Sequence, residues 1–290
     1  MLTIWGRIGR GIGLGVLIGL LNFLGITSVG SAVSIGFALA AEPGATLESV
    51  TAVDGETLFR QAFSALQAGD FASADRYWTE AIARFPDNPA AWSNRGNVRI
   101  AQNQLEAAIA DYNHAIDLAP EVPDAYLNRG IALAGLGQWQ MAIVNYNQVL
   151  SLSPQAADAY DAYNNRGNAY AGLGDWQAAI ADYQQAIALK ATDVMAQTNY
   201  ALALYQTDRA TESLQTLRQL VRKYPNFADA RAALTAVLWA QGQRGEAESN
   251  WVAVVGLDPR YQDLSWVRSI RRWPPAMVTA LKQFLQVEGA

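Results

Sequence analysis

Small and aromatic residues return at fixed places in a 34-residue period that runs six times along the chain. Counted from Pro89, position 8 is Gly96, position 20 is Ala108, position 24 is Tyr112 and position 32 is Pro120. A period of this length is typical of stacked helical hairpins, in which each hairpin packs only on its neighbours. The sequence therefore predicts an all-α solenoid.

Each repeat is expected to hold two antiparallel helices. Small residues at positions 8, 20 and 27 let the helix axes approach, and the aromatic residue at position 24 fills the gap beside them. Proline at position 32 ends the second helix. Three extra residues, 157–159, precede the fourth repeat and predict one added turn at the start of its first helix. The expected repeats are residues 55–88, 89–122, 123–156, 160–193, 194–227 and 228–261.

Residues 262–290 do not repeat, but they keep helical spacing on both sides of Pro274–Pro275. A solenoid needs a terminal element that covers its last open hairpin. This tail is therefore expected to form a C-terminal helical cap. The alternative is a docking patch for acidic partners or lipid headgroups, built from the tail's arginine and tryptophan side chains. Those residues are Trp266, Arg268, Arg271, Arg272 and Trp273.

The first forty residues carry Arg7 and Arg10, then an uncharged apolar stretch, and end in Ala38–Leu39–Ala40. A basic start, an apolar middle and small residues at the end are typical of a signal peptide cut after Ala40. The alternative is an uncleaved membrane anchor, because about 20 apolar residues span a bilayer. Residues 41–54 show no helical period and are expected to be a linker.

The three repeats from residue 89 to residue 193 closely resemble tetratricopeptide repeats (TPRs), and the flanking repeats stay in phase. The resemblance implies a right-handed superhelical solenoid of six hairpins. It also implies that the first helix of each repeat lines a concave groove, mainly through positions 2, 5, 6, 9, 12 and 13. Proteins of this family usually bind other proteins and do not catalyse reactions.

Position 6 is asparagine in four successive repeats, a row that resembles the asparagine ladder of superhelical relatives. Such amides can pair with the backbone of an extended peptide without reading its side chains. Asparagine is also an ordinary choice at this position in the family's idealised repeat. The expected groove residues are Asn94, Asn97, Leu127, Asn128, Ile131, Asn164, Asn165, Asn168, Asn199, Leu202 and Tyr205.

The groove differs from that of chaperone-binding relatives, which hold an acidic peptide tail with lysines at positions 2 and 5 and an arginine at position 6. Here Asp124, Ser93 and Asn164 stand at such lysine positions, and asparagines stand at position 6. A neutral or basic extended segment, with apolar side chains in the groove, is the expected partner.

Position 7, usually leucine in the family, is arginine in the second, third and fourth repeats. Each of these repeats also carries an aspartate or asparagine at position 23. We predict a contact between the two helices of each repeat, formed by an ion pair or a hydrogen bond. The expected pairs are Arg95 with Asp111, Arg129 with Asn145, and Arg166 with Asp182.

Composition removes several classes of function. The chain has no cysteine, a single histidine and a formal net charge of -5. Thiolate zinc sites, iron–sulfur clusters and cysteine nucleophiles are therefore excluded, and a nucleic-acid binder would show a basic stripe. His114 has Asp111 and Asp117 three residues to either side, which fits a helix-surface pair. No catalytic residue, metal or cofactor is expected.

These observations predict a non-catalytic scaffold for another protein. The export leader predicts a periplasmic or thylakoid-lumenal location, soluble or tethered through residues 1–40. The amino-acid sequence of the repeats resembles repeats abundant in cyanobacteria and chloroplasts. Some proteins that contain such repeats assist photosystem assembly. The alternative is a membrane-anchored organiser that uses the N-terminal apolar segment and the Arg/Trp-rich tail. The oligomeric state does not follow from the sequence.

Overall fold

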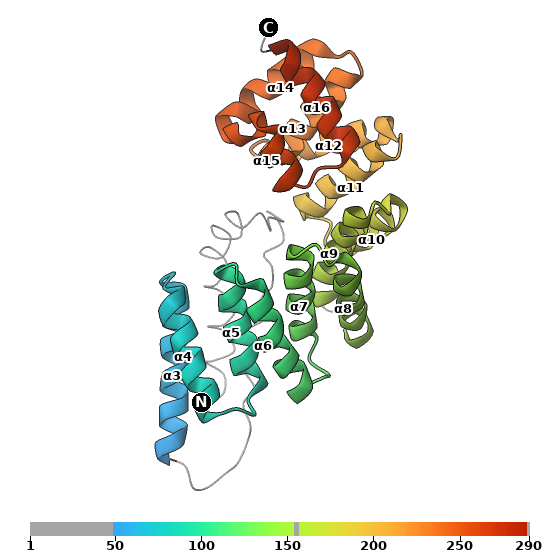
Figure 1. The fold of residues 1–290 in the computed structure, drawn as a ribbon. Coiled ribbons are helices and arrows are strands. Elements are labelled where there is room, and N and C mark those ends of the chain that lie inside the picture. Colours follow the sequence, from blue (N-terminus) through green and yellow to red (C-terminus); the bar gives the residue numbers. More distant parts are fainter. Residues whose placement is uncertain (1–48, 154–156, 289–290) are drawn as a thin grey trace. The chain divides into compact units, whose positions relative to one another are not determined.

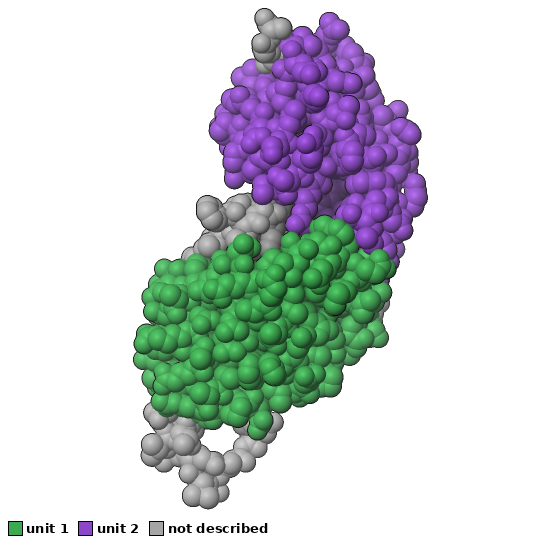
Figure 2. All heavy atoms as spheres, in the orientation of Figure 1, with its two compact units in different colours: residues 1–24, 32–162 green, residues 25–31, 163–290 purple. Residues whose placement is uncertain are grey.

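The computed structural model describes residues 49–153 and 157–288, and within these residues the fold consists of helices with no strands (Figure 1). The described chain divides into two compact bodies, shown in green and purple in Figure 2. The first body holds the described residues up to Ala162, and the second begins at Tyr163. The division falls inside one helix, α9 (Ala157–Leu173).

Three complete helical hairpins form the first body. Their helices are α3 (Ser49–Gln67) and α4 (Phe71–Arg84), α5 (Pro89–Ala101) and α6 (Leu105–Leu118), and α7 (Pro123–Gly135) and α8 (Trp139–Leu152). Proline is the first residue of both α5 and α7, where its missing N–H costs no hydrogen bond. Each helix packs on the next along the chain, which is the connectivity of a helical solenoid.

The second body continues the series and adds the tail. It contains the rest of α9 with α10 (Trp176–Leu189), α11 (Val194–Gln206) with α12 (Ala210–Lys223), α13 (Ala228–Ala240) with α14 (Arg244–Leu257), and then η1 (Pro259–Gln262), α15 (Leu264–Ser269) and α16 (Pro275–Glu288). The six hairpins match the six predicted repeats. The added turn of the fourth repeat is confirmed, because α9 has 17 residues where α7 has 13.

One boundary differs from its prediction. The linker was expected to reach residue 54, but α3 begins at Ser49. Residues 49–54 contain neither proline nor glycine, so nothing in them stops the helix from extending toward the N-terminus. The predicted leader, residues 1–40, and the rest of the linker lie outside the described residues. None of the described helices is both long and apolar enough to cross a membrane.

Glycine at position 8 and tyrosine at position 24 explain how the two helices of a repeat approach. A methyl group added to Gly130 would lie 2.6 Å from the ring of Tyr146, which is buried. The same addition to Gly96 would meet Tyr112 at 2.7 Å. Glycine therefore leaves room for the tyrosine ring where these helices cross, in keeping with the small residue predicted at position 8.

The predicted cap is confirmed, and α16 is its main element (Figure 1). This helix packs on α13 and α11, the first helices of the last two repeats. Its buried apolar face holds Met277, Leu281 and Phe284. The Phe284 ring centroid lies 5.2 Å from those of Trp239 and Trp251, both in edge-to-face geometry.

Candidate functional site

The arginines at position 7 lie between the two helices of their repeats, as predicted. The Arg95 guanidinium donates two hydrogen bonds to the Asp111 carboxylate, at 2.7 and 3.0 Å. Arg166 donates two to Asp182, both at 2.7 Å. The third pair joins Arg129 Nε to Asn145 Oδ1 at 2.8 Å. Each guanidinium also lies over the aromatic ring at position 4 of its repeat, 5.0–5.5 Å from the ring centroid. These arginines therefore join the helices of each repeat.

The asparagines at positions 6 and 9 form a hydrogen-bond network that occurs once in each body. In the first body, Asn97 Oδ1 accepts from the Tyr112 hydroxyl at 2.7 Å and from Asn128 Nδ2 at 3.1 Å. The position-6 amide thus pairs with position 9 of the preceding repeat. The NH₂ group of Asn128 is consequently used inside the protein, and its oxygen remains for other contacts.

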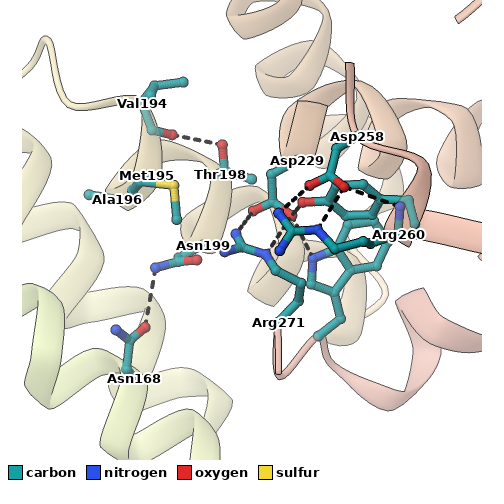
Figure 3. Close-up of polar contacts among 12 residues, drawn as sticks. Asn168, Val194, Met195, Ala196, Thr198, Asn199, Asp229, Asp258, Arg260 and Arg271 are labelled. Atoms are coloured by element: carbon teal, nitrogen blue, oxygen red, sulfur yellow. Dashed lines mark hydrogen bonds and ion pairs between the residues drawn. The ribbon is translucent and has the colours of Figure 1, made fainter. Parts of the chain in front are cut away.

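The second body repeats this geometry (Figure 3). Asn168 Oδ1 accepts from the Tyr183 hydroxyl at 2.8 Å and from Asn199 Nδ2 at 3.2 Å. The prediction included the asparagines but missed the tyrosines. A sequence signal exists, because the second and fourth repeats combine asparagine at position 9 with tyrosine at position 24. The third repeat has Ile131 at position 9.

Several concave amide atoms of the first body are buried and lack a hydrogen-bond partner among the described residues. They are Asn94 Oδ1, Asn97 Nδ2 and Asn128 Oδ1. These residues are at most 2 % exposed, and the predicted groove residues Leu127 and Ile131 are buried with them. Buried polar atoms almost always have partners, so these three unpaired amide atoms are an unusual feature of the first body.

In the second body the predicted groove residues fall into two groups. Asn165, Asn168 and Asn199 are partly exposed, whereas Asn164 is buried with both amide atoms unpaired among the described residues. The second group requires a correction. Leu202 and Tyr205 were expected to line an open groove, but they share a hydrophobic cluster with α16.

The reason lies in the packing of the tail. Leu202 is 4 % exposed and Tyr205 is partly buried, in one cluster with Met277, Leu281 and Phe284 of α16. The apolar residues that predicted a ligand groove on α11 therefore pack with the chain's own C-terminal helix, because burying apolar surface is favourable whichever segment supplies it.

Two of the five residues expected in the alternative Arg/Trp docking patch, Arg271 and Trp273, are used inside the protein (Figure 3 shows Arg271). The Arg271 side chain is 5 % exposed and forms an ion pair with Asp229, itself 3 % exposed, at the start of α13. The same carboxylate accepts from the Tyr261 hydroxyl at 2.6 Å and from Trp273 Nε1 at 2.9 Å. A buried carboxylate needs these partners, so Arg271 and Trp273 hold the cap in place and are not available to a partner.

Asp124, at the start of α7, is the titrating group of the predicted groove. Burial and the negative charge of Asp158 raise its pKa from the ordinary value of 3.8 to about 6. The folded state therefore holds a proton that the unfolded chain loses near pH 4, and stability falls as the pH rises through this window. We expect Asp124→Asn to stabilise the chain by about 1 kcal/mol at neutral pH and to leave it unchanged near pH 4.

Urea unfolding of wild type and Asp124→Asn at the two pH values measures this difference. A variant that gains as much stability near pH 4 as at neutral pH would contradict the assigned titration. Asp175→Asn is the matched control, because the Asp175 carboxylate caps the exposed start of α10 by accepting from Ala178 N at 3.1 Å. This control should change stability little at either pH, because asparagine caps a helix about as well as aspartate.

A cluster of side chains that could bind a metal is not found in the described part of the chain. There, no group of three or more histidine, aspartate or glutamate side chains is placed to hold a metal ion. The ring of His114 lies against Trp92, with the ring centroids 4.4 Å apart. Asp111, a predicted neighbour of His114, pairs instead with Arg95 and Arg99.

Comparisons with protein-family models agree with this geometry. One model, "TPR repeat", matches residues 96–137. Two models named "Tetratricopeptide repeat" match residues 160–193 and, in the other case, residues 56–88, 124–156 and 195–226. Among curated proteins, no sequence matches the chain.

Solved structures show the same fold at low sequence identity. A tetratricopeptide repeat protein from Parabacteroides merdae ATCC 43184 is 19% identical with a TM-score of 0.62, covering 82% of this chain and 87% of its own. MamA from Desulfovibrio magneticus RS-1 is 17% identical with a TM-score of 0.54, covering 58% and 93%. YrrB, described as a TPR protein with an unusual peptide-binding site, is 20% identical with a TM-score of 0.51, covering 63% and 92%. With stacked hairpins in both bodies and family matches in every repeat but the last, the chain belongs to the tetratricopeptide repeat proteins, a family of protein-interaction scaffolds.

Proposed function

We propose that this chain is a non-catalytic scaffold that binds an extended polypeptide segment along the concave face of its first body. The unpaired amide atoms of Asn94, Asn97 and Asn128 carry this proposal. They provide two acceptors and one donor on successive first helices. The backbone of an extended peptide offers alternating N–H and C=O groups that complement such a row. The description of YrrB as peptide-binding supports this assignment by analogy.

The chemistry of the face favours a neutral or basic segment. Leu127 and Ile131, on the same helix as Asn128, are apolar and buried. Asp124 and Asp158 are both partly buried, and burial raises the pKa of each carboxyl group. A basic side chain near these groups would favour their charged forms, whereas an acidic peptide would meet like charge.

Selection of random displayed peptides on the full chain tests the proposal. Selected peptides should bind the double variant Asn94→Ala/Asn128→Ala at least about tenfold more weakly, because buried polar partners are lost. N-methylation along the best peptide should abolish binding at alternating backbone positions. Gln140→Ala/Gln177→Ala, which removes two exposed amides from second helices, is the matched control. Equal binding to wild type and to the double variant would overturn the proposal.

We also propose that the protein acts outside an inner membrane, in the periplasm or thylakoid lumen. The apolar residues 1–40 and their Ala38–Leu39–Ala40 ending support this location. A role as a photosystem assembly factor is supported only by the resemblance of the repeat sequences to those of cyanobacterial and chloroplast proteins. The N-terminal peptide mass of protein from its native source should begin at Ala41 if the leader is cleaved. A protein retained in carbonate-washed membranes with residues 1–40 attached would instead support the membrane-anchored organiser.

A further inference from the structure

The second helix of the third repeat, α8, differs on one face from α6 and α10, its counterparts in the second and fourth repeats. Helices α6 and α10 share the run Ala-Ala-Ile-Ala-Asp-Tyr, at residues 107–112 and 178–183. At the same positions α8 reads Met-Ala-Ile-Val-Asn-Tyr, residues 141–146. The three differences are two larger apolar side chains and the loss of one carboxylate. All three differences fall within six residues of one helix, so α8 departs from the sequence that α6 and α10 share.

The two apolar replacements are exposed. Met141 is 56 % exposed and Val144 is 63 % exposed. They stand three residues apart, so they lie on the same side of α8. The corresponding alanines of α6 and α10 show that the fold does not require large side chains here. Met141 and Val144 therefore add apolar surface to the outside of the protein without adding to its core.

The lost carboxylate leaves one arginine with neutral partners only. Arg129 donates to Asn145 Oδ1 at 2.8 Å and to Asn113 Oδ1 at 2.7 Å. It forms no ion pair with any carboxylate in the described ranges, whereas Arg95 and Arg166 each hold an aspartate. Burial lowers the pKa of Arg129, whereas the hydrogen bonds that Arg166 donates to Asp182 raise the pKa of Arg166. The half-buried guanidinium thus forms no ion pair within the described ranges, although the charge of Asp117 acts on it.

The two features adjoin each other through one side chain. Asn145 accepts from Arg129, and its own Nδ2 donates to the Met141 carbonyl at 2.8 Å. We name Arg129, Met141, Val144 and Asn145 the α8 surface. We propose that the α8 surface binds a segment of a different protein. That segment places an aspartate or glutamate carboxylate on Arg129 and an apolar side chain on Met141 and Val144.

Charge decides the class of partner. A carboxylate matches the planar donors of a guanidinium and supplies the anion that Asn145 does not. A membrane surface or a nucleic acid would need several cations together. Here Arg129 is a single cation, and the negative charge of the exposed Asp117 acts on it. A protein segment that combines one acidic and one apolar side chain is therefore the fitting occupant.

This docking does not depend on the concave site. The α8 surface lies mainly on a second helix, whereas the amide row lies on first helices. The test is a selection of random displayed peptides on the full chain, with counter-selection against the variant Met141→Ala/Val144→Ala/Asn145→Asp. This variant gives α8 the residues that α6 and α10 already carry, so it should fold. Circular dichroism and thermal unfolding of the variant test whether it folds.

The enriched peptides should share an acidic residue next to a large apolar residue. Their binding should weaken at least about tenfold in Asn145→Asp, because the new carboxylate occupies Arg129 as Asp111 occupies Arg95. Met141→Ala/Val144→Ala should weaken it as well. Asn94→Ala/Asn128→Ala should not, and neither should Val252→Ala, which truncates another exposed valine, on α14.

Three outcomes would overturn the proposal. One is a selection that yields no enriched peptide, and another is a set of peptides that bind Asn145→Asp as tightly as wild type. The third comes from analytical ultracentrifugation. A wild-type dimer that dissociates in the triple variant would assign the α8 surface to contact with a second copy of this chain.

Discussion

Replacing Arg271 with alanine should destabilise the second body by about 3–5 kcal/mol, the usual cost of removing one partner of a buried ion pair. Asp229 is 3 % exposed, and its carboxylate would lose its ion-pair partner and be left with the Tyr261 hydroxyl and Trp273 Nε1 as donors within the described residues. Burial opposes the charged form of Arg271, but the Asp229 carboxylate more than offsets this effect and raises the pKa of Arg271. Urea unfolding followed by circular dichroism measures the loss.

A double-mutant cycle separates the ion pair from simple truncation. Asp229→Asn/Arg271→Ala removes both charges, so its destabilisation should be smaller than the sum of the two single effects. Arg268→Ala is the matched control, because Arg268 is exposed on α15, and it should change stability by less than about 0.5 kcal/mol. A loss in Arg271→Ala no larger than that of the control would show that the pair does not hold the cap.

Replacing Gly130 with alanine should destabilise the first body by about 1–3 kcal/mol, since the added methyl group would overpack the crossing of α7 and α8. The new carbon would lie 2.6 Å from the ring of Tyr146, a residue that is 1 % exposed. For a protein of this size each kcal/mol corresponds to about 2–4 °C in the melting temperature. Thermal unfolding therefore provides the measurement.

Two further variants identify the cause. Gly256→Ala is the matched control, because a methyl group at this exposed position of α14 meets no atom within 4 Å. It should be neutral or stabilising by up to about 1 kcal/mol. Tyr146→Leu should lessen the effect of Gly130→Ala by removing part of the ring. If Gly130→Ala proves as stable as Gly256→Ala, the close approach is not what requires glycine.

The interior of each repeat was predictable from local sequence. Helix lengths, the turns between helices and the pairs of glycine with tyrosine depend on residues within one 34-residue period. The Arg95–Asp111 and Arg129–Asn145 contacts were predictable for the same reason, because position 7 and position 23 change together within a repeat. Such contacts need only the geometry of one helical hairpin.

The candidate site was predictable only in part. The row of asparagines was visible, but the pairing of Asn128 with Asn97 joins two repeats and depends on the exact stacking of α7 on α5. The sequence pattern also assigned Leu202 and Tyr205 to an open groove, because it could not show that α16 covers them. Periodicity indicates which face of a helix is apolar and leaves open which segment covers that face.

The sequence by itself determined the family, the six hairpins and the residues at their crossings, because each of these follows from spacing inside a repeat. The tertiary structure alone decided which helices the tail packs on and which charged group Arg271 pairs with. Arg271 lies 42 residues after Asp229, outside any repeat. A buried ion pair between residues so far apart in the sequence forms because packing brings two faces together. A repeat period within the sequence does not specify which faces these are.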